Sequence, residues 1–346
     1  MLERTLPNLV QLVDEVVLLD TGSTDRTVEI AEKLGARVFH FSWINDFSAA
    51  RNESLKHARG EWILWADADE FIKAEDMEKI KAELAGSKEI AYLLKVAECH
   101  EGEFNPVSYN LRPKIFRNGL GIHFKRPINE QVMTAEEKFV VNLAKKLEVN
   151  IYHWGNFLSE DKLTKKKERN LTLLKGVVEG GGGDAAYHFL LGTNYRDLGM
   201  NEQALAEFDK VIEQWPNGEF VKEARTEKAW LLYLLKRLKE AYQEAVEILK
   251  LDPENSTAWN VVGITHMALG ENEKAVGYFQ RSIDSDPKDI TSRVKLVQKE
   301  YVANLLLSRT YLRLGKKEEA FAAASRAYKY DATDEVKRVL EKAQCQ

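Results

Sequence analysis

The chain has 346 residues, of which 44% are hydrophobic and 30% are charged, and its net charge is -5. This length exceeds that of one ordinary domain, so we expect two domains or one domain followed by a repeat array. The composition is that of a soluble globular protein, and the lack of a basic stripe argues against a nucleic-acid binder.

The sequence contains no sign of export or of a membrane anchor. No apolar run approaches the roughly 18 residues of a membrane helix, and the N-terminus lacks a basic segment followed by an apolar one. The two cysteines, Cys99 and Cys345, supply neither a disulfide framework nor a metal cluster. We therefore expect a cytoplasmic protein without a membrane span.

The first elements alternate between helices and strands. Apolar residues recur at helical spacing over residues 1–13, a strand is expected over 16–19, a helix over 26–34 and a strand over 37–43. This βαβ pattern predicts a parallel sheet covered by helices. Asp20 follows the first strand, at the carboxyl end where such sheets bind ligands.

A second acidic strand end lies further along the chain. Residues 62–66 are apolar and aromatic, which predicts a strand buried on both faces. Asp67 and Asp69 follow it, and in an extended chain they point to the same side. With Glu70 they would form an oxygen-only cluster suited to Mg²⁺ or Mn²⁺. The alternative is that these acids only solvate a loop.

A helix over residues 47–60 carries Arg51 and Asn52 near the same edge of the sheet. The Arg51 guanidinium could pair with a phosphate or donate to a base. The alternative is an ordinary surface salt bridge.

Three motifs resemble the family 2 glycosyltransferases of the A-type fold, in particular the bacterial members that continue into tetratricopeptide repeats. They are Asp20-Thr-Gly-Ser-Thr-Asp25, Phe47-Ser-Ala-Ala-Arg51-Asn52 and Trp62-Ile-Leu-Trp-Ala-Asp67-Ala-Asp69-Glu70. The resemblance implies a Rossmann-like α/β nucleotide-diphospho-sugar transferase domain and an inverting transfer of a sugar, usually from a UDP-sugar. It further implies that Asp20 contacts the nucleoside, Arg51 the base or phosphates, and Asp67 with Asp69, the DXD pair, the ribose and a metal-bound diphosphate.

The resemblance also exposes a missing element. The family has a further strand ahead of the helix with which this chain begins, and that strand lies near the middle of the sheet. Loss of an interior strand would leave backbone groups unpaired. We therefore expect either an incomplete donor pocket or a coding start placed too late.

Two later residues extend the candidate site. Residues 127–132 resemble the family's His-Glu segment, with Asn129 in place of the histidine, and Glu130 is the candidate general base. A salt bridge to Arg126 or a loop cap is an equally good interpretation of Glu130. His153 ends a strand expected over 146–154 and resembles a family histidine that completes the metal shell or contacts the diphosphate. The alternative is a packed, hydrogen-bonded histidine.

The second half of the sequence repeats. The alanines at 204, 241, 275 and 320 are 37, 34 and 45 residues apart, and Pro216, Pro253 and Pro287 close the first three units. A period near 34 with small residues between paired helices is typical of a tetratricopeptide superhelix, whose groove suits an extended peptide or a partner subunit. Four glycines at 180–183 predict a linker. We expect a catalytic domain over 1–158, a connecting helix and linker over 159–183, and repeats over 184–346.

Two functions remain open from the sequence. The first is a transferase that uses Mn²⁺ or Mg²⁺ and a nucleotide-sugar donor, with a peptide, protein or glycan acceptor bound by the repeats. The second is a non-catalytic binding protein that carries an incomplete transferase domain. The repeats could also pack on the catalytic domain or form a homodimer, and the sequence identifies neither sugar nor acceptor.

Overall fold

The computed structural model describes residues 2–104, 106, 108–155, 160–218, 220–285 and 297–344. The chain divides into two compact units, Met1–Leu173 and Leu174–Gln346. Pro287, Cys345 and the domain boundary expected at residue 158 lie outside the described residues. Within the described ranges, no helix combines the length and the apolar character needed to cross a membrane.

The first unit begins with a βαβ arrangement. Helix α1 (Leu2–Leu12) is followed by β1 (Val17–Asp20), α2 (Thr27–Lys33) and β2 (Arg37–His40). Strands β1 and β2 are parallel, with Asp20 opposite His40, which confirms the predicted parallel pair. The pairing ends where β1 ends, so β2 is shorter than the 37–43 strand expected from the sequence.

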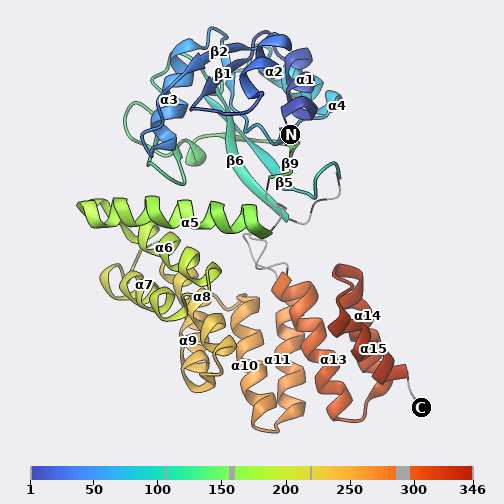
Figure 1. Ribbon diagram of the computed structural model, residues 1–346. Coiled ribbons are helices and arrows are strands. Elements are labelled where there is room, and N and C mark those ends of the chain that lie inside the picture. The colour runs from blue at the N-terminus through green and yellow to red at the C-terminus, as the bar shows by residue number, and fades with distance from the viewer. Residues whose placement is uncertain are drawn as a thin grey trace. The chain divides into compact units, whose positions relative to one another are not determined.

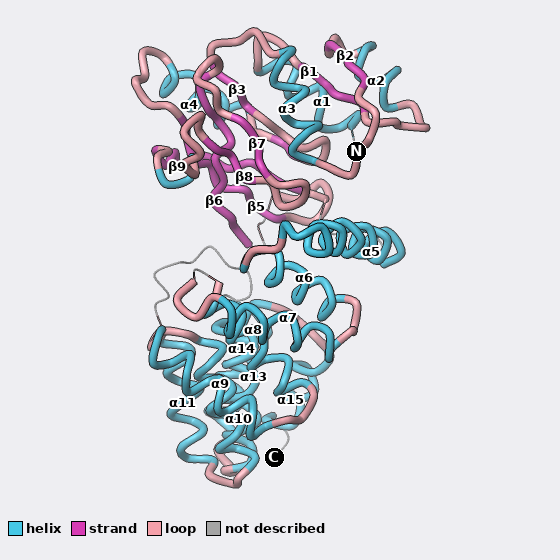
Figure 2. The backbone as a smooth tube through the Cα atoms, turned by 90° about the vertical axis from the view of Figure 1, so that its left-hand side faces the viewer, coloured by secondary structure: helices cyan, strands magenta, loops and turns pink. Residues whose placement is uncertain are grey.

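A five-stranded sheet forms the rest of this unit (Figures 1 and 2). Its strand order is β3-β6-β5-β9-β4, and all pairs are antiparallel except β5 with β9. Strands β7 and β8 make a separate hairpin. The elements are α3 (Phe47–His57), β3 (Trp62–Leu64), β4 (Glu70–Phe71), α4 (Ala74–Leu84), β5 (Ala91–Glu98), β6 (Ser108–Arg117), β7 (His123–Lys125), β8 (Gln131–Met133), a short helix (Val140–Asn142) and β9 (Lys145–His153).

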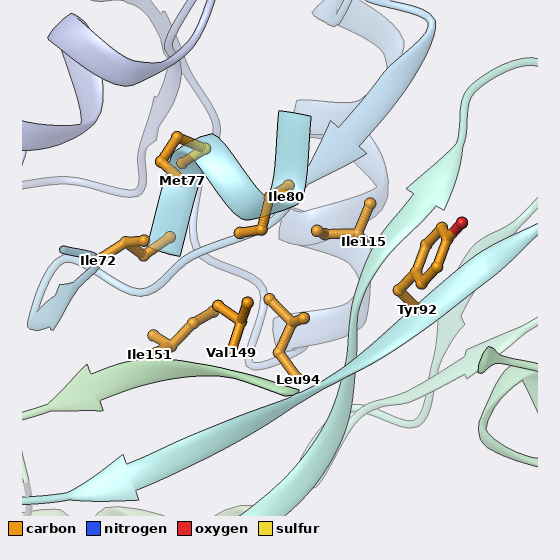
Figure 3. Close-up of a cluster of buried hydrophobic side chains, with 8 residues drawn as sticks. All are labelled: Ile72, Met77, Ile80, Tyr92, Leu94, Ile115, Val149 and Ile151. Carbon is orange, nitrogen blue, oxygen red and sulfur yellow. The ribbon is translucent and has the colours of Figure 1, made fainter. Parts of the chain in front are cut away.

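One core cluster of this unit lies between α4 and the five-stranded sheet. Figure 3 shows Met77 and Ile80 of α4 facing aliphatic and aromatic side chains of β5, β6 and β9. Tyr92, Leu94 and Ile151 are completely buried. This burial fixes the position of β9, whose last residue belongs to the candidate site.

The sheet is divided into two pieces. β1 pairs only with β2, and β3 is the edge strand of the larger sheet, paired only with β6 among the described strands. Trp62 and Leu64 are therefore only half-buried, and the prediction that this strand is buried on both faces is wrong. In the described chain β1 is the first strand and it follows α1.

The glycine stretch directly follows a long helix. Helix α5 (Glu160–Val177) continues directly into a π-helical turn (Val178–Gly182), in which Gly181 takes a left-handed φ of 81°. The left-handed Gly181 puts a kink in this turn, and the role of residues 180–183 as a linker stays a prediction.

The second unit consists of paired antiparallel helices. A Cβ on Gly192 would lie 2.6 Å from the Phe208 ring, and a Cβ on Gly263 would lie 2.5 Å from the Phe279 ring. Only glycine therefore permits these helix pairs to approach so closely. The alanines at 204, 241, 275 and 320 are completely buried, which confirms the repeat prediction. The helices, seen in Figure 1, are α6 (Ala185–Asp197), α7 (Asn201–Gln214), α8 (Val221–Leu234), α9 (Leu238–Leu251), α10 (Ser256–Ala268), α11 (Asn272–Asp284), a π-helical turn (Val297–Val302), α13 (Ala303–Arg313), α14 (Lys317–Tyr330) and α15 (Asp334–Gln344).

Candidate active site

Arg51 joins two acidic residues that are far apart in the sequence. Asp46 caps α3 by accepting a hydrogen bond from the Ala49 N–H, and Arg51 lies in the helix that follows. Its Nη2 donates to Asp67 Oδ1 at 2.8 Å and its Nε donates to Glu130 Oε1 at 2.9 Å. The guanidinium also lies over the Trp65 ring, 4.5 Å from its centroid. Three residues singled out from the sequence therefore meet in one network.

This network is ionic. Burial tends to raise the pKa of Asp67, but the positive charges of Arg51 and Lys114 outweigh it and lower that pKa to about 2. Burial opposes the charge of Arg51 as well, yet the two carboxylates raise its pKa above the usual range. Arg51 and Asp67 are therefore charged at neutral pH.

The segment after β3 is a tight turn rather than an extended chain. The Glu70 N–H donates to the Asp67 carbonyl at 3.0 Å, and the Asp67 N–H donates to Glu70 Oε2 at 2.9 Å. The prediction that Asp67 and Asp69 follow strand alternation is therefore wrong. The turn directs Asp67 to Arg51 and Asp69 to His153, which are different partners.

Lys114 of β6 was missed by the sequence reasoning. Its Nζ donates to Glu70 Oε2 at 2.7 Å, and the two side chains are 0% and 3% exposed. The same nitrogen lies 3.4 Å from the centroid of the Trp65 ring. Burial lowers the pKa of Lys114. The available signal was a lysine directly before the apolar pair Ile115 and Phe116, whose charge would need a buried partner.

His153 lies between two carboxylates. Its Nε2 is 3.4 Å from Asp69 Oδ2, and its Nδ1 is 2.8 Å from Oε2 of Glu98, a second residue that the sequence did not single out. Burial tends to lower the pKa of His153, but both carboxylates raise it to about 10. In this arrangement the imidazole is a cation that holds Asp69 in place.

Asp69 occupies a space that only a glycine leaves open. A Cβ on Gly155 would lie 1.7 Å from Asp69 Oδ2. The other oxygen, Oδ1, is buried and has no hydrogen-bond partner within the described chain. A buried carboxylate oxygen without a partner is unfavourable unless a ligand or ion satisfies it.

The Asp20 carboxylate stabilises the turn that follows β1. Its carboxylate accepts hydrogen bonds from the Gly22 and Ser23 N–H groups at 3.2 and 3.0 Å, and it lies 3.5 Å from His40 Nδ1. The bonds to Ser23 hold the pKa of Asp20 below its usual value although burial raises it. The described contacts of Asp20 thus fix the loop after β1 and do not extend to Arg51.

The predicted oxygen-only cluster does not form. In the described part of the chain, no three His, Cys, Asp or Glu side chains are arranged to hold a metal ion. The reason is that Glu70 turns inward to Lys114 and Asp67 is bound by Arg51. Among these described acids, Asp69 alone has a buried oxygen without a hydrogen-bond partner. This donor set fits a divalent cation that takes most of its ligands from a substrate diphosphate and water.

The fold and site define an α/β domain with an acidic site at a strand end, joined to a helical repeat array. The sequence of residues 1–141 matches the family model "Glycosyl transferase family 2". Residues 189–248, 243–290 and 301–334 match tetratricopeptide repeat models. The chain thus carries a family 2 glycosyltransferase domain followed by tetratricopeptide repeats.

Two curated relatives are similar to parts of the chain. A TPR repeat-containing protein of Synechococcus elongatus is 39% identical over 132 residues, 38% of this chain and 32% of the relative. The SPbeta prophage-derived glycosyltransferase SunS of Bacillus subtilis is 28% identical over 208 residues, 58% of this chain and 48% of the relative. The matched regions therefore span less than half the length of these two relatives.

One solved structure is similar to about half of the chain. It is a thermophilic TPR protein of Thermus thermophilus, which is 18% identical, with coverage of 53% of this chain and 93% of that chain and a TM-score of 0.39.

Proposed function

We propose that this chain transfers a sugar, with inversion, from a nucleotide-diphosphate donor, most simply a UDP-sugar, to a peptide or glycan acceptor. The observation that carries the proposal is the Arg51 network, which holds Asp67 and Glu130 at 2.8 and 2.9 Å from one guanidinium. The network joins Asp67, at the end of a strand, to Glu130, from a separate segment of the chain. The two carboxylates can therefore have different roles in one site.

Glu130 is our candidate general base. In an inverting transfer, the acceptor oxygen attacks the anomeric carbon as the bond from that carbon to the diphosphate oxygen breaks. The acceptor's proton passes to a carboxylate, and the nucleoside diphosphate leaves. Arg51 orients Glu130 through their ion pair. The proton would move to the Glu130 oxygen that Arg51 does not hold.

Asp67, Arg51 and Asp20 are our candidates for donor binding. Asp67 remains a carboxylate at neutral pH and keeps an oxygen that Arg51 does not occupy, which suits a hydrogen bond from a ribose hydroxyl. The Arg51 guanidinium lies over the Trp65 ring, and one edge of it faces the carboxylates of Asp67 and Glu130. Asp20, held by its turn, would contact the nucleoside from the end of β1.

Asp69 would hold Mn²⁺ or Mg²⁺, with His153 beside it. A bound divalent cation offsets the negative charge that develops on the departing nucleoside diphosphate. Asp69 Oδ1 is the oxygen that such an ion would take. His153 is cationic in this arrangement, so it positions Asp69 through Nε2 unless it first loses its proton.

The repeats supply the second binding surface in this proposal. Stacked helix pairs present a groove that suits an extended peptide, so an acceptor peptide or a partner subunit would bind there. A homodimer formed through the repeats is compatible with the same surface.

A second candidate function is a non-catalytic binding protein built on an incomplete transferase domain. The gap in the sheet between β1 and β3 favours this second candidate. The cavity along these two strands is also lined by Arg51 and Trp65, so the gap lies beside the candidate site. Donor binding separates the two candidates.

The test is calorimetric titration of UDP into the full chain, with and without Mn²⁺. We expect binding that depends on the metal and that disappears in Asp69→Ala, with Asp161→Ala as a control at an exposed aspartate. Equal UDP affinity of wild type and Asp69→Ala in Mn²⁺ would remove Asp69 from the site. No binding by wild type under either condition would favour the non-catalytic candidate.

A further inference from the structure

Helix α5 carries a row of basic side chains that the proposed mechanism does not use. Lys162, Lys165 and Arg169 are spaced at i, i+3 and i+7, so they lie on one side of the helix. All of them are exposed, and residues 160–173 of α5 belong to the first compact unit. This basic row is about 10 Å long, since a helix rises about 1.5 Å per residue.

Arg169, at one end of the basic row, lies beside the candidate active site. Its guanidinium lies over the Phe47 ring, 5.1 Å from the ring centroid. The Phe47 N–H donates to the Pro127 carbonyl at 2.8 Å, in the segment that leads to Glu130. Burial lowers the pKa of Arg169, although the negative charge of Glu130 opposes this effect. Arg169 is therefore within electrostatic reach of the candidate base.

Arg169 differs from Arg51 in its partners. Arg51 is bound by two carboxylates, whereas Arg169 Nη2 donates to Asn170 Oδ1, the amide of its sequence neighbour, at 3.2 Å. In the described part of the chain, no carboxylate forms an ion pair with Arg169, Lys162 or Lys165. A guanidinium that a ring shields on one face and that has no counterion gains more from an anionic ligand than a paired one does.

The ring beneath Arg169 belongs to an apolar surface at the start of α3. The Trp43 ring packs edge-on against the Phe47 ring, with centroids 4.7 Å apart, and both residues are half-buried. Ile44, next to Trp43 in the sequence, is 59% exposed. An apolar surface beside unpaired cations suits a peptide, whose side chains can be apolar at one position and acidic at the next.

We infer that Arg169, followed along α5 by Lys165 and Lys162, binds acidic side chains of a peptide acceptor whose nucleophile lies at Glu130. The length of the basic row favours a peptide over the sugar donor. About three extended residues span 10 Å, whereas a diphosphate at Arg169 is too short to reach Lys162. The inference rests on the proposed function, because Glu130 marks the acceptor side only as the base.

The first experiment measures peptide binding to the full chain by fluorescence anisotropy, with UDP and Mn²⁺ present. Two labelled peptides of about ten residues share a central serine and the same apolar residues. One has Asp and Glu beside the serine, and the other has Asn and Gln at those positions. We expect the acidic peptide to bind about fivefold more tightly at low salt, and the difference to disappear near 1 M NaCl. Equal affinities, or no binding of either peptide, would overturn the inference.

Variants of Arg169 locate the bound acid. Arg169→Gln should lose most of the preference for the acidic peptide. Arg169→Glu should reverse it, in favour of a third peptide with Lys at the same positions. Arg59→Gln, at an exposed arginine of the same unit, is the matched control and should keep the wild-type preference. An acidic preference that survives in Arg169→Glu, or that Arg59→Gln also loses, would contradict the assignment.

Titration of UDP separates this inference from the proposed function. We expect Arg169→Gln to keep the Mn²⁺-dependent UDP affinity of the wild type, because Arg169 contacts the acceptor. A lower UDP affinity with an unchanged peptide preference would assign Arg169 to the donor diphosphate and overturn the inference. Normal UDP binding by the wild type together with equal affinities for the two peptides would refute the acidic acceptor alone and leave the proposed transferase in place.

Discussion

Lys114 and Glu70 form an ion pair at 2.7 Å that is buried on both sides, between the turn of Asp67 and the five-stranded sheet. Removing one partner of such a pair leaves an uncompensated buried charge. We expect Lys114→Met to lower the free energy of unfolding of the first unit by about 3 to 5 kcal/mol. Urea unfolding followed by tryptophan fluorescence measures this change.

Two further variants give this prediction its controls. Lys146→Met breaks an exposed pair with Glu148 and should cost much less than Lys114→Met. The double variant Lys114→Met/Glu70→Leu should recover part of the loss, because no charge is then left buried without a partner. Equal losses for Lys114→Met and Lys146→Met would contradict the role assigned to the buried pair.

The Asp67–Arg51 pair predicts a pH dependence of stability. The pKa of Asp67 is about 2 in the folded chain, against an ordinary value of 3.8 in an unfolded one. A lowered pKa stabilises the fold above the unfolded value, and this stabilisation is lost as the pH falls from about 4 towards 2. The stability difference between wild type and Asp67→Asn should therefore stay constant from about pH 7 to 5 and shrink below about pH 4. Urea titrations at these pH values test it, with Asp161→Asn as the exposed control; a difference that grows in acid would refute it.

Gly155→Ala should displace the Asp69 carboxylate while leaving the Asp69 side chain itself unchanged. The added Cβ would lie 1.7 Å from Asp69 Oδ2, so the carboxylate must move. If Asp69 holds the metal, Mn²⁺-dependent UDP affinity should fall by about 10- to 100-fold, as for other changes around metal ligands. Gly176→Ala in α5 meets nothing within 4 Å and should leave the affinity unchanged. Wild-type affinity in Gly155→Ala would argue against the metal role of Asp69.

Glu130→Gln tests the proposed base. Transfer should fall by about 10²- to 10⁴-fold, the usual contribution of general acid–base catalysis, while UDP binding stays close to that of wild type. Glu137→Gln, in the turn after β8, loses pairs with Lys125 and His123 and serves as the control. Sugar transfer at the wild-type rate in Glu130→Gln would exclude Glu130 as the base.

The sequence predicted the elements of both units well, because their signals are local. The helical spacing of α1, the run before Asp67 and the alanines of the repeats all depend on residues a few positions apart. The same motifs also brought Arg51, Asp67 and Glu130 into one hypothesis, and the structure places them in one network.

What the sequence did not predict depends on tertiary pairing. The partners Lys114 and Glu98 come from β6 and β5, and their roles follow from strand order, which no local pattern encodes. The turn that separates Asp67 from Asp69 is fixed by the reach of Glu70 to Lys114, so alternation along an extended chain gave the wrong geometry. The burial of β3 was overestimated for the same reason, since its composition does not reveal how many neighbours it has.

The close contacts of Gly192 with Phe208 and of Gly263 with Phe279 also bear on how the repeat array deforms. Each ring fills the space of a missing side chain, so sliding of one helix past its partner would force a collision. Neither of these two glycine–phenylalanine contacts joins one helix pair to the next. The array should therefore behave as a series of stiff segments joined by softer contacts, and most of its elastic bending should occur between helix pairs rather than within them.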